Sequence, residues 1–275
     1  MNDVFAALVL GVIQGLTEFL PVSSTAHLTL VPWLLGWESP LLNSLTFDVA
    51  LHMGTLLATL IYFAREWALL VRGGVSSILT RTINGDPWKR LAWLVVLATI
   101  PGALAGMFLE SAIESVFRSP WLVGVALIVM GVALAWAEKV GTKRVNMQSM
   151  SAFEALAMGL GQAIAVVPGV SRSGGSMTMG MLAGLSRESA ARFSFIMAAP
   201  IIAGASAKRF KDVLAAGAGD QMLVMLTGFL ASAIVGFAVI HFLMRYLQRG
   251  TLYVFFWYRL LLGALVLAVF FVRGG

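Results

Sequence analysis

Six apolar stretches of this chain are each long enough, or nearly long enough, to cross a lipid bilayer. A helix needs about 20 apolar residues for this, because the hydrocarbon core of a bilayer is about 30 Å thick. The composition agrees, since 59% of the 275 residues are hydrophobic and 12% are charged, about half the charge of a soluble domain. We therefore predict an all-α polytopic membrane protein with six spanning helices. The stretches are 41–63, 91–109, 121–137, 194–207 with some extension, 222–244 and 252–272.

Shorter apolar stretches form two further pairs, and a polar segment containing Pro and, in the second pair, Gly interrupts each pair. The first pair lies near 4–37 and is interrupted by TEFLPVSSTAH at 17–27. The second lies near 152–187 and is interrupted by PGVSRSGGS at 168–176. Backbone freed by such a break must be satisfied inside the protein or beside water, and paired breaks indicate a binding site. We predict two re-entrant helix pairs in addition to the six spans.

The two halves of the chain resemble each other. A shift of 148 residues without a gap brings several polar and glycine residues into coincidence. This predicts two repeats, 1–137 and 150–275, separated by a basic linker at 138–149. Each repeat has an odd number of spans, so the two repeats should have inverted topology. The coinciding residues include Gly11 with Gly159, Gln14 with Gln162, and Ser23 with Ser171.

Lysine and arginine in loops predict the orientation, because cytoplasmic loops of membrane proteins are rich in both. Loop 64–90 and the linker are basic, so we expect both in the cytoplasm. The first interrupted pair then enters and leaves from the outer side, and the second from the inner side. Loop 208–220 is also basic and would lie outside, against the rule. The net charge of +6 is accordingly assigned to cytoplasmic loops and not to nucleic-acid binding.

Two other features limit the classes of site. The absence of cysteine excludes a thiolate metal site and a cysteine nucleophile. The opening apolar stretch has no basic segment before it, so we expect it in the mature protein and not in a signal peptide.

Three ionisable side chains lie in the two breaks. Glu18 and His27 belong to the first break and Arg172 to the second. Ionisable groups inside a membrane are costly and are functional candidates by default. If the repeats face each other, the two breaks meet near the midplane. The breaks also supply the polar side chains of Gln14, Ser23, Ser24 and Thr25 and of Ser171, Ser173 and Ser176, together with Gly174.

The second break has the composition of an anion site. The planar guanidinium of Arg172 matches phosphate oxygens, and Ser171 and Ser173 place hydroxyls beside it. Gly174 allows backbone N–H groups to approach an anion. A helix expected to begin near Ser176 would direct its N-terminus at the same place, where the helix dipole favours negative charge.

The first break adds groups that could do chemistry at that anion. Glu18 would repel an anion, so we expect it to bind Mg²⁺ or Ca²⁺ or to orient His27. Gln14 lies one helical turn before Glu18 and could reach the same ion. His27, Ser24 and water all remain candidates for the attacking nucleophile.

Polar residues outside the breaks are weaker candidates. Asp48 and His52 are four residues apart near the end of a span, so we expect them to pair or to support the site. Arg259 lies beside Trp257 and Tyr258, and we expect it to extend toward the membrane interface.

The motifs of both breaks resemble those of the undecaprenyl-diphosphate phosphatase family of bacterial membranes, also known as bacitracin-resistance proteins. The resemblance extends over the whole chain in length and order of hydropathy. Gln14 stands where the family also accepts Glu, and Ser176 stands where it usually has Thr. The matching motifs are Gln14-Gly-Leu-Thr-Glu18, Pro21-Val-Ser23-Ser24-Thr25-Ala-His27 and Pro168-Gly169-Val-Ser171-Arg172-Ser173-Gly-Gly-Ser176.

The resemblance implies hydrolysis of undecaprenyl diphosphate to undecaprenyl phosphate and phosphate, which recycles the lipid carrier for cell-wall synthesis. It also implies dependence on a divalent cation and an active site open to the outer face of the plasma membrane. Bacitracin resistance follows because bacitracin competes for the substrate, and a homodimer is possible. The functional positions of the family map to Glu18, Ser24, His27, Ser171, Arg172, Ser173 and Ser176.

The alternative is a secondary transporter or flippase for an anionic or phospholipid-like substrate, because inverted repeats with broken helices are a transporter architecture. Glu18 and His27 beside the anion site favour hydrolysis, since a carrier needs neither a base nor a metal.

Overall fold

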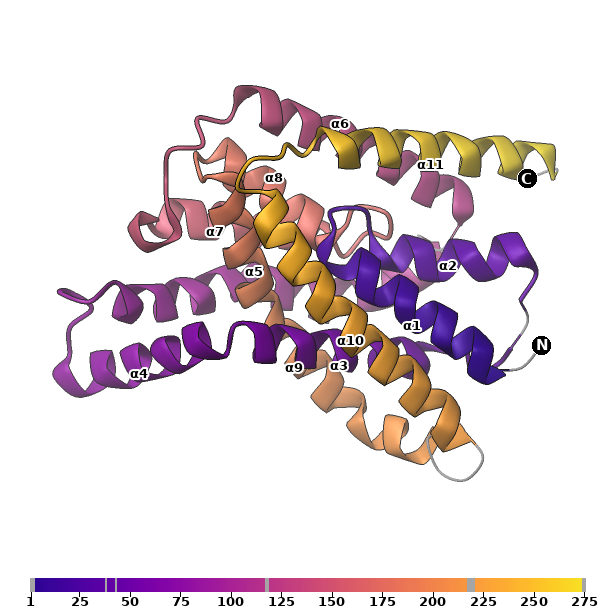
Figure 1. Ribbon diagram of the computed structural model, residues 1–275, viewed down its shortest axis with the longest axis horizontal. Coiled ribbons are helices and arrows are strands. Elements are labelled where there is room, and N and C mark those ends of the chain that lie inside the picture. The colour runs from indigo at the N-terminus through magenta and orange to yellow at the C-terminus, as the bar shows by residue number, and fades with distance from the viewer. Residues whose placement is uncertain (1–2, 38, 43, 117–118, 217–220, 274–275) are drawn as a thin grey trace.

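The computed structural model describes residues 3–37, 39–42, 44–116, 119–216 and 221–273 (Figure 1). For residues 109–116 and 214–216 it describes the backbone but not the side chains. Residues 1–2 at the start of the first predicted repeat and 274–275 at the end of the second lie outside this part. Within it the chain folds into eleven α-helices and a short 3₁₀ helix, η1. The elements are α1 (Asp3–Phe19), α2 (Ser24–Leu35), α3 (Leu45–Tyr62), α4 (Ala64–Thr80), α5 (Pro87–Val116), α6 (Pro120–Val140), η1 (Met147–Ser149), α7 (Ala152–Ile164), α8 (Arg172–Leu182), α9 (Arg187–Ala216), α10 (Met222–Tyr246) and α11 (Tyr253–Val272).

The predicted all-helical fold with six spans is confirmed. Six helices of the described chain are long and apolar enough to cross a membrane, and each coincides with one predicted stretch. The apolar lengths run from 18 residues in α3 to 27 residues in α9. The six helices are α3, α5, α6, α9, α10 and α11.

Helix α4 differs from the prediction, in which segment 64–90, with its five Lys and Arg residues, is a loop. Its apolar residues nevertheless recur at helical spacing. Leu70 and Gly73 face α5, and Val71 and Val75 are exposed on another face. Gly73 permits this packing, since a Cβ atom there would lie 2.6 Å from the backbone carbonyl carbon of Trp88. In Figure 1, α4 continues beyond α3 at the left.

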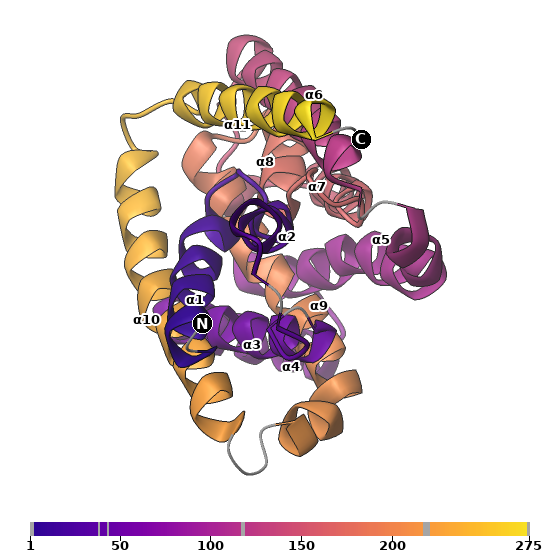
Figure 2. The ribbon, with the colours of Figure 1, turned by 90° about the vertical axis from the view of Figure 1, so that its right-hand side faces the viewer.

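The short helices before each break pack against different spans in a reciprocal manner. Helix α1 lies along α10, and α7 lies along α5. A glycine allows each close contact, because a Cβ at Gly11 would lie 2.6 Å from the carbonyl oxygen of Gly228, and one at Gly159 would lie 2.6 Å from that of Ala98. Helices α6 and α11 form a third pair, side by side in both views (Figures 1 and 2).

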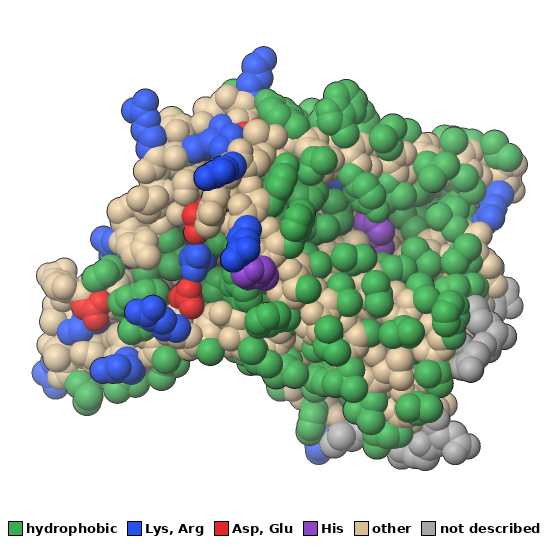
Figure 3. Space-filling model, in the orientation of Figure 1, with side chains coloured by type: hydrophobic (Ala, Val, Ile, Leu, Met, Phe, Trp, Pro, Cys, Tyr) green, Lys and Arg blue, Asp and Glu red, His purple; other side chains and the backbone are tan. Residues whose placement is uncertain are grey.

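Charge is distributed unevenly over the surface. In Figure 3 the Lys and Arg side chains gather over the left part of the face, while hydrophobic side chains cover its centre and right. Buried Glu138, at the end of α6, anchors the basic end of the molecule through ion pairs with Arg187 and Lys143. The exposed basic residues from the predicted cytoplasmic segments are Arg65, Arg72, Arg81, Lys139, Arg144, Arg245 and Arg249.

Candidate active site

The two helix breaks end in the same local geometry. Ser23 caps the N-terminus of α2 at φ 74°, and Ser171 caps α8 at φ 73°. Positive φ is uncommon for a residue other than glycine, and these two serines coincide under the 148-residue shift. Each hydroxyl accepts a hydrogen bond from the backbone three residues later, from Ala26 N at 3.4 Å and from Gly174 N at 3.1 Å.

Each capping serine also forms a hydroxyl pair with the residue two positions later. The distance is 3.2 Å from Ser23 to Thr25 and 3.1 Å from Ser171 to Ser173. Ser173 donates in addition to the carbonyl oxygen of Leu20 at 3.1 Å, and this bond joins the second break to the first. The prediction that the breaks lie together is therefore confirmed by a direct contact.

Helix α8 begins at Arg172, four residues before the predicted start near Ser176. The capping bond of Ser171 explains the earlier start. The glycines that follow do not break the helix, because Gly175 packs directly against the backbone of Gly161 in α7. Ser176 consequently lies in the second turn, fully buried, where its hydroxyl donates to the carbonyl of Arg172 at 2.7 Å.

The Glu18 carboxylate is the centre of a polar cluster. Its Oε1 pairs with the guanidinium of Arg172 across the two breaks. Its Oε2 accepts from the hydroxyl of Ser24 at 2.5 Å and from the side-chain amide of Gln14 at 3.0 Å. The Nε2 atom of His52 in α3 lies 3.5 Å from the same oxygen.

This cluster brings together residues that the sequence places in three separate segments. Glu18 and Ser24 are both buried, and a buried carboxylate is strongly disfavoured unless it is paired. Arg172 is that partner, and the ion pair offsets part of the free energy that each charge loses when it is removed from water. The short hydrogen bond directs the hydroxyl proton of Ser24 at the Glu18 carboxylate, which is the base that an activated hydroxyl requires.

His27 belongs to a separate contact. Its Nδ1 lies 2.7 Å from the carbonyl oxygen of Ser23, and a carbonyl only accepts, so Nδ1 carries the proton. Its Nε2 therefore accepts from the hydroxyl of Tyr258, 2.6 Å away. The two rings are stacked, with centroids 5.7 Å apart. With both ring nitrogens engaged by Ser23 and Tyr258, Glu18 does not orient His27 in this structure.

His52 is held in a defined orientation beside the Glu18 cluster. Its Nδ1 donates to the carbonyl oxygen of Asp48 at 2.7 Å, which directs Nε2 toward Glu18. The predicted relation between Asp48 and His52 thus exists, through the backbone carbonyl of Asp48.

The expectation that Arg259 extends to the membrane interface is wrong. This side chain is fully buried and donates to four backbone carbonyls. The helix breaks leave carbonyl oxygens without helical partners, and the guanidinium satisfies several of them at once. The acceptors are Leu127 at 3.2 Å, Pro21 at 2.9 Å, Gly169 at 2.7 Å and Val170 at 3.0 Å.

The comparison with known families agrees with this site. The model of the family described as "Bacitracin resistance protein BacA" matches residues 7–265, which include both breaks and all the residues above. The chain belongs to this family.

Curated relatives of this BacA family member match it over nearly its whole length. It is 49% identical to the undecaprenyl-diphosphatase of Pelotomaculum thermopropionicum, over 97% of this chain and 96% of that protein. It is 46% identical to that of Moorella thermoacetica, over 98% of this chain and 99% of the relative. It is 44% identical to that of Geobacter sulfurreducens, over 98% and 100%.

In this BacA-family site, the side chains of Gln14 and Glu18 are the candidate ligands for a divalent cation. The Oε1 atom of Gln14 is buried and has no hydrogen-bond partner in the described part of the chain, and it belongs to the amide that contacts Glu18. The described residues contain no group of three His, Cys, Asp or Glu side chains suited to a metal. Gln14 and Glu18 are thus at most a partial ligand set, and a cation held there would need its other ligands from phosphate and water.

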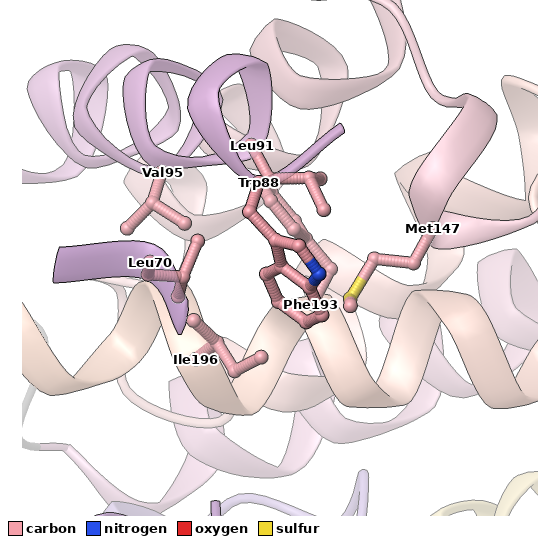
Figure 4. A pocket seen from close by; sticks show the side chains of 7 residues that line it. All are labelled: Leu70, Trp88, Leu91, Val95, Met147, Phe193 and Ile196. Atoms are coloured by element: carbon pink, nitrogen blue, oxygen red, sulfur yellow. The ribbon is translucent and has the colours of Figure 1, made fainter. Parts of the chain in front are cut away.

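A small pocket elsewhere in the fold has a different character. It lies between α4, α5, η1 and α9 and contains none of the predicted site residues (Figure 4). Its apolar lining is suited to packing and offers no group for acid–base chemistry. The lining residues are Leu70, Trp88, Leu91, Val95, Met147, Phe193 and Ile196.

Proposed function

We propose that this protein is an undecaprenyl-diphosphatase. It hydrolyses undecaprenyl diphosphate to undecaprenyl phosphate and inorganic phosphate, recycles the lipid carrier for cell-wall synthesis and confers resistance to bacitracin. Family membership and the names of the full-length relatives support this function. The observation that carries it is the cluster of Glu18, Ser24 and Arg172, because it joins a hydroxyl, a base and an anion-binding group at the point where both breaks meet.

The diphosphate binds between the breaks while its prenyl chain stays in the lipid. The N-termini of α2 and α8 begin here, and both favour an anion through their free N–H groups and their dipoles. Ser176 is bonded to Ser194 at 2.6 Å, so we assign it to holding α8 in place. The proposed substrate-binding residues are Ser23, Thr25, Ser171, Ser173 and Gly174.

Ser24 is the nucleophile that the geometry favours. Its Oγ attacks the terminal phosphorus, and its proton passes to Glu18, which already accepts its hydrogen bond at 2.5 Å. The bond from that phosphorus to the bridging oxygen breaks, and undecaprenyl phosphate leaves. Water then hydrolyses the phosphoserine and releases inorganic phosphate. His27 is less suited to attack, because Nε2 is engaged by Tyr258.

Arg172 links substrate binding to the activation of Ser24. Without substrate it neutralises Glu18. A diphosphate carries more negative charge than one carboxylate and offers more acceptors, so it competes for the guanidinium. The transfer of Arg172 to the phosphates leaves Glu18 a stronger base and stabilises charge on the transferred group. His27 contacts the phosphates once Tyr258 releases its Nε2.

Glu18 and Gln14 would hold a divalent cation, Mg²⁺ or Ca²⁺, together with phosphate oxygens of the substrate. The unpartnered Oε1 of Gln14, whose amide nitrogen donates to the carboxylate, supports this assignment. A cation there would neutralise part of the charge of the diphosphate. Ser24, Arg172 and Glu18 carry out the steps described above in either case.

The arrangement in the membrane is part of the proposal. The two interrupted pairs, near 4–37 and 152–187, are re-entrant, and the repeats 1–137 and 150–275 have inverted topology around the cytoplasmic linker 138–149. The matched serine caps and the reciprocal packing of α1 on α10 and α7 on α5 support this repeat. The site opens to the outer face of the plasma membrane. A reporter fused at residue 145 should be cytoplasmic, and an external reporter would contradict this orientation.

A homodimer remains a prediction. Chemical crosslinking in native membranes should produce a species of twice the monomer mass, whereas monomer alone at all crosslinker concentrations would remove the dimer from the account.

Release of phosphate distinguishes the enzyme from a transporter or flippase. The purified protein in detergent, without a membrane potential, should release phosphate from a C₅₅ diphosphate. A carrier would release none in detergent and would instead move its ligand across vesicles. The described residues favour hydrolysis because the Ser24–Glu18 bond has no role in carrying an anion.

A further inference from the structure

Arg259 is the most deeply buried charged side chain in the described chain, and it lies between the two helix breaks with none of its surface exposed. One of its nitrogens donates to Pro21 in the first break, and another donates to Gly169 in the second. These two residues coincide under the 148-residue shift. The guanidinium therefore holds the equivalent carbonyl oxygen of each break.

The bound carbonyls precede the two unusual serines. Ser23 lies two residues after Pro21, and Ser171 lies two residues after Gly169. Both serines adopt positive φ and start the helices whose N-termini face the proposed phosphate site. A shift of either carbonyl would rotate the chain that leads into these caps, so Arg259 is placed to set both helix starts together.

The charge of Arg259 is also not cancelled by a direct partner. Its hydrogen bonds go to carbonyl oxygens, and within the described residues no carboxylate lies at ion-pair distance from it. The clustered charges of the breaks are Glu18 and Arg172, which neutralise each other. Arg259 therefore leaves one positive charge beside the place where a diphosphate would bind.

We infer that Arg259 is a positioning residue that aligns the two breaks for phosphoryl transfer and supplies part of the attraction for the anionic substrate. This inference rests on the proposed function of the same site. The competing explanation is that Arg259 contributes only to the stability of the fold.

Two substitutions separate geometry from charge. Arg259→Lys keeps the charge. The three donors of an ammonium group lie on one atom, so they cannot reach all four carbonyl oxygens that the three nitrogens of the guanidinium reach. We expect kcat to fall on the order of 10²-fold with KM nearly unchanged, because small displacements of reacting groups cost rates of this size. Arg259→Gln loses both properties, so KM should also rise.

A matched control measures the effect of stability alone. Arg187 is a partly buried arginine that also joins helices, and its partner is Glu138 and not a residue of either break. Arg187→Lys should lower the melting temperature in detergent while the folded protein keeps its wild-type kcat.

A distance measurement tests alignment without activity. The chain has no cysteine, so two introduced cysteines can carry spin labels without background. Leu16 and Ile164 are 41% and 55% exposed, coincide under the 148-residue shift and lie just before the two breaks. Pulsed electron paramagnetic resonance on Leu16→Cys/Ile164→Cys should give one narrow distance distribution, which Arg259→Lys broadens and Arg187→Lys does not.

Should Arg259→Lys fail to fold, Gly174→Ala provides a milder perturbation of the same contact. The added Cβ would lie 3.0 Å from Nη1 of Arg259 and 3.1 Å from Cβ of Ser171, so it would shift the guanidinium and the helix cap relative to each other. This variant should show the same pattern of lower kcat and a broader distance, with smaller amplitude.

The outcomes are distinct. A folded Arg259→Lys protein with wild-type kcat, or with reduced kcat but an unchanged label distance, would overturn the positioning role. Wild-type protein that releases no phosphate would instead refute the proposed function, and the label distance would still test whether Arg259 aligns the breaks.

Discussion

Glu18→Gln is the substitution whose consequences follow most directly from the structure. Gln has the size of Glu but no charge, and it cannot serve as the proton acceptor for Ser24. What is lost is the basic carboxylate that accepts the hydrogen bond from the Ser24 hydroxyl, 2.5 Å long in the structure, because an amide oxygen can accept that bond but cannot take up the proton. General-base catalysis contributes about 10²- to 10⁴-fold, so kcat should fall by this factor. At about 1.36 kcal/mol per tenfold, the barrier rises by roughly 2.7–5.4 kcal/mol.

The same change should also lower stability, since it leaves Arg172 without its counterion. Loss of one partner of a fully buried pair costs about 3–5 kcal/mol. The Arg172 side chain keeps 20% of its surface exposed, so water compensates in part and a loss of about 1–3 kcal/mol is expected.

Glu138→Gln is the matched control for this experiment. Glu138 is equally buried and also pairs with an arginine, but it lies at the end of α6 and outside the site. It should lose comparable stability while kcat stays within about twofold of wild type. The assay is phosphate release from a C₅₅ diphosphate in detergent, with melting measured on the same samples. The reasoning is refuted if Glu18→Gln keeps more than a tenth of the wild-type kcat, or if both variants lose the same activity.

Further substitutions test the other roles. Rapid acid quenching followed by mass spectrometry should find a phosphate on Ser24 in wild type and none in Ser24→Ala, and a phosphate on another residue would reassign the nucleophile. Arg172→Ala and His27→Ala should each abolish turnover while the protein still inserts, so wild-type phosphate release by either variant would remove that residue from the mechanism. Tyr258→Phe frees Nε2 of His27 but leaves the stacked ring, so kcat should change at least about threefold, and an unchanged pH–rate profile would show that the hydroxyl does not control His27.

The spans were predictable from the sequence because each contains a long apolar stretch. Helix α4 was not, since Arg65, Arg72 and Arg81 hide a helical pattern whose packing depends on one glycine, Gly73. The start of α8 was misplaced by four residues for a related reason. Two consecutive glycines normally argue against a helix, and only the tertiary contact of Gly175 with α7 makes them acceptable there.

The site was predictable as a set of residues but not as a set of bonds. Polar groups in two interrupted helices indicated that the breaks meet, and the pair of Glu18 with Arg172 joins them. The partner of each group depends on tertiary packing, so the sequence left open whether Glu18 binds a cation or orients His27, and it did not predict the bond from Ser24 to Glu18. The structure favours Ser24.

Arg259 was misassigned because an arginine in a span beside aromatic residues is typical of the membrane interface. The sequence did contain a signal for the buried position of Arg259, because two helix breaks inside a membrane need hydrogen-bond donors for their carbonyl oxygens. Carbonyl oxygens freed inside a membrane require partners, and a long side chain with five N–H groups can supply them.

The most direct test of the account compares phosphate release by wild type with release by one variant from each break. Ser24→Ala changes the first break and Arg172→Ala the second, and both are assayed with a C₅₅ diphosphate at equal amounts of folded protein. If the breaks form one hydrolytic site, wild type releases phosphate and each variant loses at least about 100-fold in rate. Release at the wild-type rate by either variant, or none by wild type, would contradict the account.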